Sequence, residues 1–208
     1  MDEITALKQL AELERLGKKP GELRLAAESW GSPFQILIST IMSARTRDEV
    51  TIKVAEKLFK KYPTAEKLSE AELSDLEELI KPVNFYRNKS KNILNCAKVL
   101  FEEHRGKVPT DLDSLVSLPG VGRKTANVFL SEIGDDAIGV DTHVAHISGK
   151  LGWTKHPPES AHKIESNLKE LFSKKHWGKI NPTLVRFGKT HTSRKEKDEL
   201  LGEVRKIR

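Results

Sequence analysis

The amino-acid sequence predicts an all-α protein, because apolar residues recur at helical spacing in nearly every segment. Helix-starting signals precede several of these segments, and no stretch alternates between apolar and polar residues for long enough to predict a strand. The chain has 208 residues, 37% of them hydrophobic and 32% charged. This composition is typical of a globular protein with one large domain or two small ones.

The first part of the chain contains the most apolar of the predicted helices. A helix over residues 4–16 carries its apolar residues on one face. A capping box that begins at Ser32, with proline at the first helical position, opens a helix over about residues 33–43. Because that helix is apolar all round, we expect it in the middle of a core. Similar capping boxes at Thr46 and Ser69 predict two more helices.

Helices with short connections are predicted for the rest of the chain as well. Capping residues or prolines precede most of them, including Asp141 and Pro182. The sequence contains no internal repeat and no low-complexity segment. These helices cover about residues 88–104, 111–117, 123–133, 142–151, 159–172, 182–189 and 194–207.

Apolar runs and cysteine usage exclude several classes of protein. No apolar run approaches the roughly 20 residues that a membrane helix needs, and residues 1–16 lack the uninterrupted apolar stretch of a signal peptide. We therefore expect no membrane contact and a cytoplasmic location. The one cysteine, Cys96, lies at apolar spacing in a predicted helix, which favours a buried structural thiol.

Positive charge is concentrated in the second part of the chain. Residues 1–80 contain 12 Lys and Arg against 15 Asp and Glu, whereas residues 81–208 contain 24 against 15. A basic region suits a polyanionic partner such as nucleic acid. Solvated faces of helices rich in Lys and Glu are the alternative explanation for the same composition.

The most specific motif is Leu-Pro-Gly-Val-Gly-Arg-Lys-Thr-Ala at residues 118–126, between two short predicted helices. Its two glycines allow a left-handed turn and the close approach of another backbone. The following helix presents its first N–H groups at the turn, where helix N-termini bind phosphate. A plain glycine turn between core helices is the alternative. The motif predicts a helix-hairpin-helix that grips a DNA backbone through Leu118, Gly120, Val121, Gly122, Arg123 and Thr125.

Together with Val-Asp-Thr-His at residues 140–143, this motif closely resembles the endonuclease III branch of the helix-hairpin-helix DNA glycosylases. The resemblance covers roughly residues 30–150 and also rests on residues 32–34, on Ser43, Ala44, Thr46 and Asp48, and on Tyr86, Lys89, Asn92 and Ile93. It implies two helical domains with a DNA-binding cleft between them and the hairpin at the cleft mouth. Residues 26–136 would form a helical barrel, and residues 1–25 plus 137–208 the other domain.

Two catalytic residues are implied by the same resemblance. Lys124 matches the family's lysine nucleophile, and Asp141, 17 residues later, matches its essential aspartate. Base removal builds positive charge at the anomeric carbon, which a carboxylate stabilises, and a neutral amine can attack that carbon to form a Schiff base. Ordinary lysine has a pKa of about 10.4, so we expect desolvation or Arg123 to lower the pKa of Lys124. Taken alone, Lys124 would be a surface lysine and Asp141 a helix cap.

A damaged base must leave the stack before it can be cut, and a side chain must fill the gap that it leaves. By resemblance, Arg45 and Phe85 are these wedges, and Ser43 and His143 are further DNA contacts. Arg45 stands where bacterial relatives commonly have glutamine. Simple exposure in loops is the alternative for both wedges. The expected partner is duplex DNA with damaged bases or abasic sites, bound by a monomer.

The sequence departs from the family at its C-terminal end. Most members carry there a four-cysteine loop that holds a [4Fe–4S] cluster, but the region after Gly188 has no cysteine. We therefore expect no iron–sulfur cluster, no other cofactor and no metal. The last 20 residues carry seven Lys and Arg against four acidic residues. We hypothesise that this helical tail replaces the cluster as a clamp and as a DNA-contacting surface.

These observations predict a bifunctional DNA glycosylase and AP lyase that removes oxidised pyrimidines, such as thymine glycol, and nicks DNA by β-elimination. An 8-oxoguanine glycosylase is the alternative within the superfamily, whereas mismatch-thymine and uracil glycosylases often lack the lysine. A non-enzymatic DNA-binding module is possible on the hairpin alone. A metal-dependent hydrolase would use Asp141, His143 and His146, whose spacing allows two imidazoles on one helical face. The resemblance also implies a prokaryotic, archaeal source.

Overall fold

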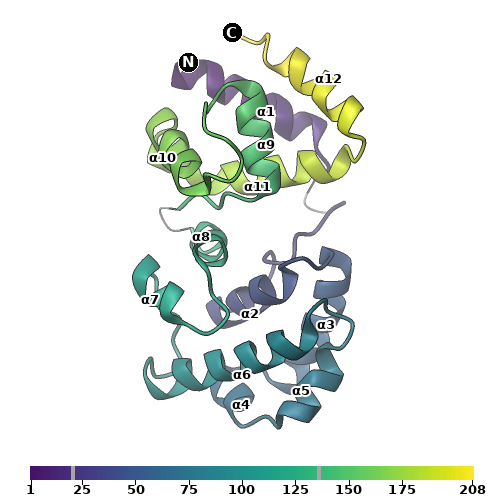
Figure 1. Cartoon of the computed structure of the whole chain (residues 1–208), viewed down its shortest axis with the longest axis vertical. Helices are drawn as coiled ribbons and strands as arrows, with labels where there is room; N and C mark the ends of the chain where they lie inside the picture. Colours follow the sequence, from purple (N-terminus) through teal and green to yellow (C-terminus); the bar gives the residue numbers. More distant parts are fainter. Residues whose placement is uncertain (20–21, 135–136) are drawn as a thin grey trace. The chain divides into compact units, whose positions relative to one another are not determined.

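The structure is a computed structural model, and it describes residues 1–19, 22–134 and 137–208 (Figure 1). These residues form helices and connecting loops without a strand, which confirms the all-α prediction. They divide into two compact units, Arg24–Ile133 and the combination of Met1–Leu23 with Gly134–Arg208. The domain boundary predicted at residue 136 lies outside the described residues. None of the described helices combines the length and the apolar character that a membrane span needs.

In the unit Arg24–Ile133, the central element is α2 (Pro33–Ser43), which packs against α3, α6 and α8. Ser32 caps this helix by accepting the Gln35 N–H at 3.3 Å, and Pro33 occupies its first turn, as the sequence predicts. The apolar side chains of α2 are buried, apart from the half-buried Ile36 and the exposed Pro33. The surrounding helices are α3 (Asp48–Lys61), α4 (Ala65–Ser69), α5 (Leu73–Ile80), α6 (Tyr86–Glu102), α7 (Leu112–Ser117) and α8 (Arg123–Glu132).

Two of the predicted capping boxes do not cap a helix. Arg47, not Thr46, precedes α3, and the Thr46 hydroxyl accepts the backbone N–H of Asn84 at 3.1 Å instead. Ser69 closes α4, a helix too short to show a period, and its hydroxyl donates to the Glu66 carbonyl at 2.7 Å. The two predicted helices are present as α3 and α5, so only their caps were predicted wrongly. A hydroxyl bonds whichever backbone or side-chain group lies nearest, and a sequence window does not show those groups.

The other unit is built on α1 (Glu3–Leu16), α9 (Thr142–Leu151) and α11 (Trp177–Thr190), with α11 packed against both of the others. The remaining elements are α10 (Ala161–Leu171), the short 3₁₀ helix η1 (Lys174–His176) and α12 (Arg194–Val204). α11 begins five residues before Pro182, where the sequence predicted its first turn. Burial of the apolar face that carries Ile180, Leu184 and Phe187 outweighs the hydrogen bond that proline cannot donate.

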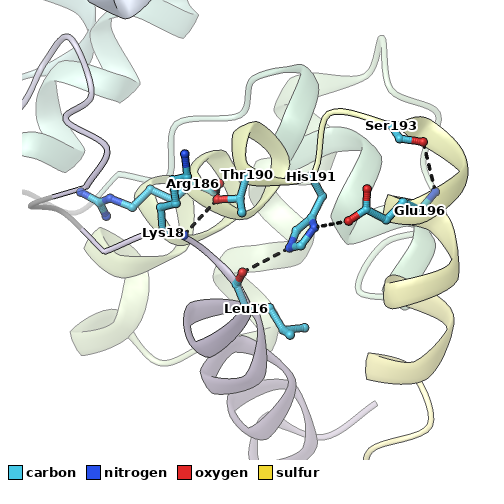
Figure 2. Close-up of polar contacts among 7 residues, drawn as sticks. All are labelled: Leu16, Lys18, Arg186, Thr190, His191, Ser193 and Glu196. Carbon is cyan, nitrogen blue, oxygen red and sulfur yellow. Dashed lines mark hydrogen bonds and ion pairs between the residues drawn. The ribbon is translucent and has the colours of Figure 1, made fainter.

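Polar contacts tie the connection between α11 and α12 to the end of α1 (Figure 2). Nδ1 of His191 lies 2.9 Å from a Glu196 carboxylate oxygen, and its Nε2 lies 3.2 Å from the Leu16 carbonyl oxygen. The backbone N–H of Lys18 donates to the Thr190 hydroxyl at 2.9 Å. A neutral imidazole carries one N–H, so both His191 contacts are hydrogen bonds only when the ring is protonated. We call these five residues the His191 clasp.

A second link joins α12 to α9. The Asp198 carboxylate on α12 lies 2.8 Å from His146 Nε2 and 2.8 Å from Lys150 Nζ, and both partners are on α9. The hydrogen bond from Lys150 is the main cause that lowers the pKa of Asp198. Leu201 and Val204 of α12 are buried, so the helix is held by apolar packing as well as by charge.

Candidate nucleic-acid interface

The hairpin between α7 and α8 has the backbone that its proline and its two glycines predict. Val121 N–H donates to the Leu118 carbonyl at 3.1 Å, with Pro119 and Gly120 at the centre of the turn. Gly120 has φ +79°, and a Cβ there would lie 2.8 Å from Cβ of Asn92 on α6. Proline followed by a left-handed glycine is the arrangement that a type II turn requires. The position therefore accepts glycine alone for two separate reasons.

The first turn of α8 is open to an anion. Gly122 precedes the helix without a side-chain cap, and a Cβ at this position would meet no atom within 4 Å. The first N–H groups of a helix have no partner within the helix. Gly122, Arg123 and Lys124 are exposed, Thr125 is half-buried, and no acidic residue lies in this turn. Outward N–H groups and two cationic side chains therefore share one end of α8, while Leu118 and Val121 are buried in the hairpin.

Asp141 caps α9, as the sequence predicts. Its carboxylate accepts the Val144 N–H at 2.9 Å, and the side chain is half-buried. His143, two residues further on, packs its ring against α11, where a Cβ on Gly188 would lie 2.8 Å from the ring carbon Cγ. Asp141 and His143 belong to the unit that contains both chain ends, and Lys124 belongs to the other unit.

The two predicted wedges, Arg45 and Phe85, lie side by side. Both have a left-handed backbone, with φ +58° at Arg45 and +60° at Phe85. The Arg45 guanidinium lies 5.0 Å from the centroid of the Phe85 ring, and the side-chain amide of Asn84 donates to the Arg45 carbonyl. Phe85 is 56% exposed, which is unusual for a large apolar side chain. We call Arg45 and Phe85 the wedge pair.

Ser43, the remaining predicted DNA contact in this unit, closes α2. It is half-buried, and its hydroxyl donates to the Thr40 carbonyl at 2.9 Å. A hydroxyl that donates in this way still has acceptor capacity. Ser43 is therefore turned toward its own helix, two residues before the exposed Arg45.

The three residues weighed as metal ligands have other partners. His146 pairs with Asp198, the Asp141 carboxylate accepts the Val144 N–H, and the His143 ring packs on Gly188. In the described parts of the chain, no three His, Cys, Asp or Glu side chains come together in a way that could hold a metal ion.

Lys89 is a functional candidate to which the sequence assigned no role. It is 8% exposed, and its ammonium donates to the carbonyls of Met42 and Ala44, each at 2.6 Å, and to the Thr46 hydroxyl at 3.2 Å. Burial lowers the pKa of Lys89 to about 8. The sequence contains one indication that Lys89 is buried, because Lys89 lies four residues before Ile93 and seven before Cys96, on the buried face of α6.

Comparisons with known proteins show the family to which the chain belongs. Residues 38–174 match the model of the HhH-GPD superfamily of base excision DNA repair proteins. The chain belongs to this superfamily. It is 45% identical over 158 residues to the endonuclease III of Thermotoga maritima, covering 76% of this chain and 73% of that protein. Endonuclease III of Bacillus subtilis is 39% identical over 161 residues, with 77% and 73% covered.

Solved structures of an endonuclease III and of a thymine-DNA glycosylase share the fold of this chain. A trapped covalent intermediate of endonuclease III with DNA superimposes with a TM-score of 0.80 at 33% identity, covering 93% of this chain and 89% of that one. A thermostable thymine-DNA glycosylase gives a TM-score of 0.78 at 19% identity, with 92% and 91% covered, which is a likeness of fold alone.

The [4Fe–4S] cluster that the sequence resemblance implies does not fit the residues of this HhH-GPD chain. A cluster of this kind is held by four cysteine thiolates, and these 208 residues contain one cysteine. Cys96 is buried in α6, and burial raises the pKa of its thiol to about 12. A raised pKa favours the protonated thiol, whereas a cluster ligand must be a thiolate.

Proposed function

We propose that this chain is a bifunctional DNA glycosylase and AP lyase of the endonuclease III type, acting in base excision repair on duplex DNA with damaged bases or abasic sites. The observation that carries the proposal is Lys124, an exposed amine in the first turn of α8, directly after a hairpin built to receive phosphate. The relatives named endonuclease III support it, as does the similar solved structure of a trapped covalent intermediate of endonuclease III with DNA. A cytoplasmic location suits this activity.

Lys124 is the proposed nucleophile. Its neutral amine attacks the anomeric carbon, the bond from that carbon to the base breaks, and the base leaves with the bonding electrons and gains a proton. The amine loses its proton and the sugar ring opens to a Schiff base. Loss of a proton from the adjacent carbon then expels the 3′ phosphate. Lys124 is exposed, so the bound DNA must remove water from its amine.

Asp141 is the proposed electrostatic partner. Positive charge builds on the sugar as the base departs, and a fixed carboxylate stabilises it without reorganising. The hydrogen bond from the Val144 N–H holds the carboxylate in one direction. The orientation in which Asp141 caps α9 is therefore also the orientation proposed for catalysis. Lys124 belongs to the unit Arg24–Ile133 and Asp141 to the other unit, and the proposal assigns both residues to one reaction, with His143 and Ser43 as further DNA contacts.

The hairpin is the proposed phosphate grip. The N–H groups at the start of α8 supply directed donors, and Arg123 supplies charge. Leu118 and Val121 hold the turn from inside, Gly120 avoids a clash with Asn92, and Gly122 leaves the start of α8 open. Contacts of this kind position a protein on DNA without reading sequence. Affinity should therefore fall steeply as salt rises.

Oxidised pyrimidines are the proposed substrates, with 8-oxoguanine as the alternative. The test is a cleavage assay on matched duplexes that carry thymine glycol, 8-oxoguanine, uracil, a G·T mismatch or an abasic site. We expect excision of thymine glycol with strand cleavage in the same reaction, and cleavage at the abasic site. A preference for 8-oxoguanine would instead support 8-oxoguanine as the substrate. Binding without cleavage of any duplex would contradict an enzyme and favour a DNA-binding module.

The terminal unit is proposed to work without a cluster or any other metal. The His191 clasp and the Asp198 link join α1, α9, α11 and α12 through side chains and backbone alone. The C-terminal tail, residues 189–208, carries seven Lys and Arg against four acidic residues and would also contact DNA. Truncation after residue 190 removes His191, Glu196 and Asp198, so it breaks both links and leaves only the hydrogen bond between Lys18 and Thr190. We expect lower thermal stability and weaker DNA binding, and the idea would be wrong if both were unchanged.

A further inference from the structure

The wedge pair is held in a backbone conformation that its residue types avoid. A positive φ is uncommon for residues other than glycine, and bulky side chains adopt it least readily. Arg45 and Phe85 both adopt it, and they lie in two different loops. The side-chain amide of Asn84 donates to the Arg45 carbonyl and so joins these loops across 39 positions of the chain. Such strain persists only where the surrounding structure enforces it. The neighbouring contacts should therefore show what enforces it.

Three side chains from these two loops and α6 close around the wedge pair. The Lys89 ammonium has three N–H donors, and it uses them on the carbonyls of Met42 and Ala44 and on the Thr46 hydroxyl. The same hydroxyl accepts the backbone N–H of Asn84. We call Lys89, Thr46 and Asn84 the wedge latch. It fixes the chain directly before and after Arg45 and directly before Phe85.

The helix that carries Lys89 also holds the hairpin. Asn92 lies three residues after Lys89 on α6, and side chains at this spacing share one face of a helix. The Asn92 side chain fills the space next to Gly120, where a Cβ would be 2.8 Å away. One face of α6 therefore supports the phosphate grip and the wedge pair together. The distance between them is set by a single rigid element.

We propose that Lys89 is a positioning residue that holds Arg45 and Phe85 as a preformed wedge and so determines how well the protein extrudes a base from the duplex. The proposal rests on the proposed function. Extruding a base costs unstacking and unpairing free energy, and a wedge that is already ordered adds no ordering cost of its own. An abasic site has no base to extrude. Loss of the wedge latch should therefore impair base excision far more than cleavage at an abasic site.

The decisive comparison is between Lys89→Met and the matched control Lys91→Met. Lys91 is an exposed lysine on the same helix, and Met keeps the length of the side chain in both cases. For Lys89→Met we expect single-turnover excision of thymine glycol to fall at least about tenfold, with cleavage at a preformed abasic site within about twofold of wild type. Lys91→Met should match wild type on both substrates.

A milder pair of variants tests the latch if Lys89→Met folds poorly. Thr46→Val removes the shared hydroxyl at nearly constant volume, whereas Thr46→Ser keeps it. We expect Thr46→Val to reproduce the selective loss and Thr46→Ser to behave as wild type. Equal losses on both substrates, or no loss in Thr46→Val and Lys89→Met, would overturn the proposal.

A binding measurement separates this proposal from the proposed function. A duplex with 2-aminopurine beside the lesion brightens when its stack opens, and this signal needs no bond cleavage. We expect wild type and Lys91→Met to raise the fluorescence and Lys89→Met to raise it much less at equal occupancy. Equal signals would overturn the positioning role whatever the chemistry. Cleavage of no substrate by wild type, with the fluorescence difference intact, would instead contradict the proposed enzyme.

Discussion

Alanine at Gly120 tests whether the hairpin depends on its left-handed turn. An L-residue in that conformation costs about 1–2 kcal/mol. The new Cβ would also lie 2.8 Å from Asn92 Cβ, and forcing one carbon into a packed site costs about 1–3 kcal/mol. The free energy of unfolding should therefore fall by about 2–5 kcal/mol, which lowers the thermal midpoint by about 4–20 °C in a chain of this size.

Alanine at Gly122 is the matched control, because the same methyl group meets no atom within 4 Å and φ is −89°. Its effect on stability should stay below about 1 kcal/mol. The methyl would stand where the phosphate approaches α8, so DNA affinity should fall. Thermal unfolding and fluorescence anisotropy with a non-cleavable abasic duplex, at fixed salt, measure both effects. Wild-type affinity in a stable Gly122→Ala protein would refute the phosphate grip, and an unchanged midpoint in Gly120→Ala would refute the packing argument.

Three further predictions concern buried or bridging groups. Asp198→Asn loses the charge that holds Lys150 and His146. The free energy of unfolding should fall by about 1–2 kcal/mol, and trypsin should cleave α12 faster. Unchanged proteolysis would count against the link. Burial raises the pKa of Cys96 to about 12, so iodoacetamide should label it at pH 8 only after unfolding, and rapid labelling of the folded protein would contradict its burial. Burial lowers the pKa of Lys89 from 10.5 to about 8. Between these two pH values the unfolded state therefore binds more protons than the folded state. The free energy of urea unfolding of wild type, relative to that of Lys89→Met, should rise with pH in this range. A flat difference would disprove that shift.

Much of the fold follows from local patterns. The apolar period and the Ser32 cap predict α2 as the buried centre of its unit, and Asp141 was recognised as the cap of α9. The failures have one physical origin. Thr46 bonds Asn84 and Lys89, which are distant in sequence, and the apolar face of α11 overrides the stop signal at Pro182. Tertiary partners decided these positions, and a local window does not contain them.

The candidate site likewise contains features that the local sequence predicts and features that depend on tertiary contacts. The turn at Gly120 and the open start of α8 are readable from residues 118–126, since proline and glycine define that backbone. The close approach of Asn92 to Gly120 is not readable, because it joins α6 to the hairpin turn across 28 positions. Lys89 gave one clue, a cation on an apolar helix face, but its three acceptors come from the end of α2 and the loop after it. Pre-organisation of the wedge pair became visible only in three dimensions.

The central claim, that Lys124 forms a Schiff base with DNA, is tested most directly by borohydride trapping. Wild-type protein incubated with a thymine glycol duplex and borohydride should give a covalent protein–DNA adduct, and mass spectrometry of its peptides should place the bond on Lys124. Lys124→Ala should bind the duplex and form no adduct. An adduct of undiminished yield in Lys124→Ala, or a bond mapped to another residue, would contradict the claim.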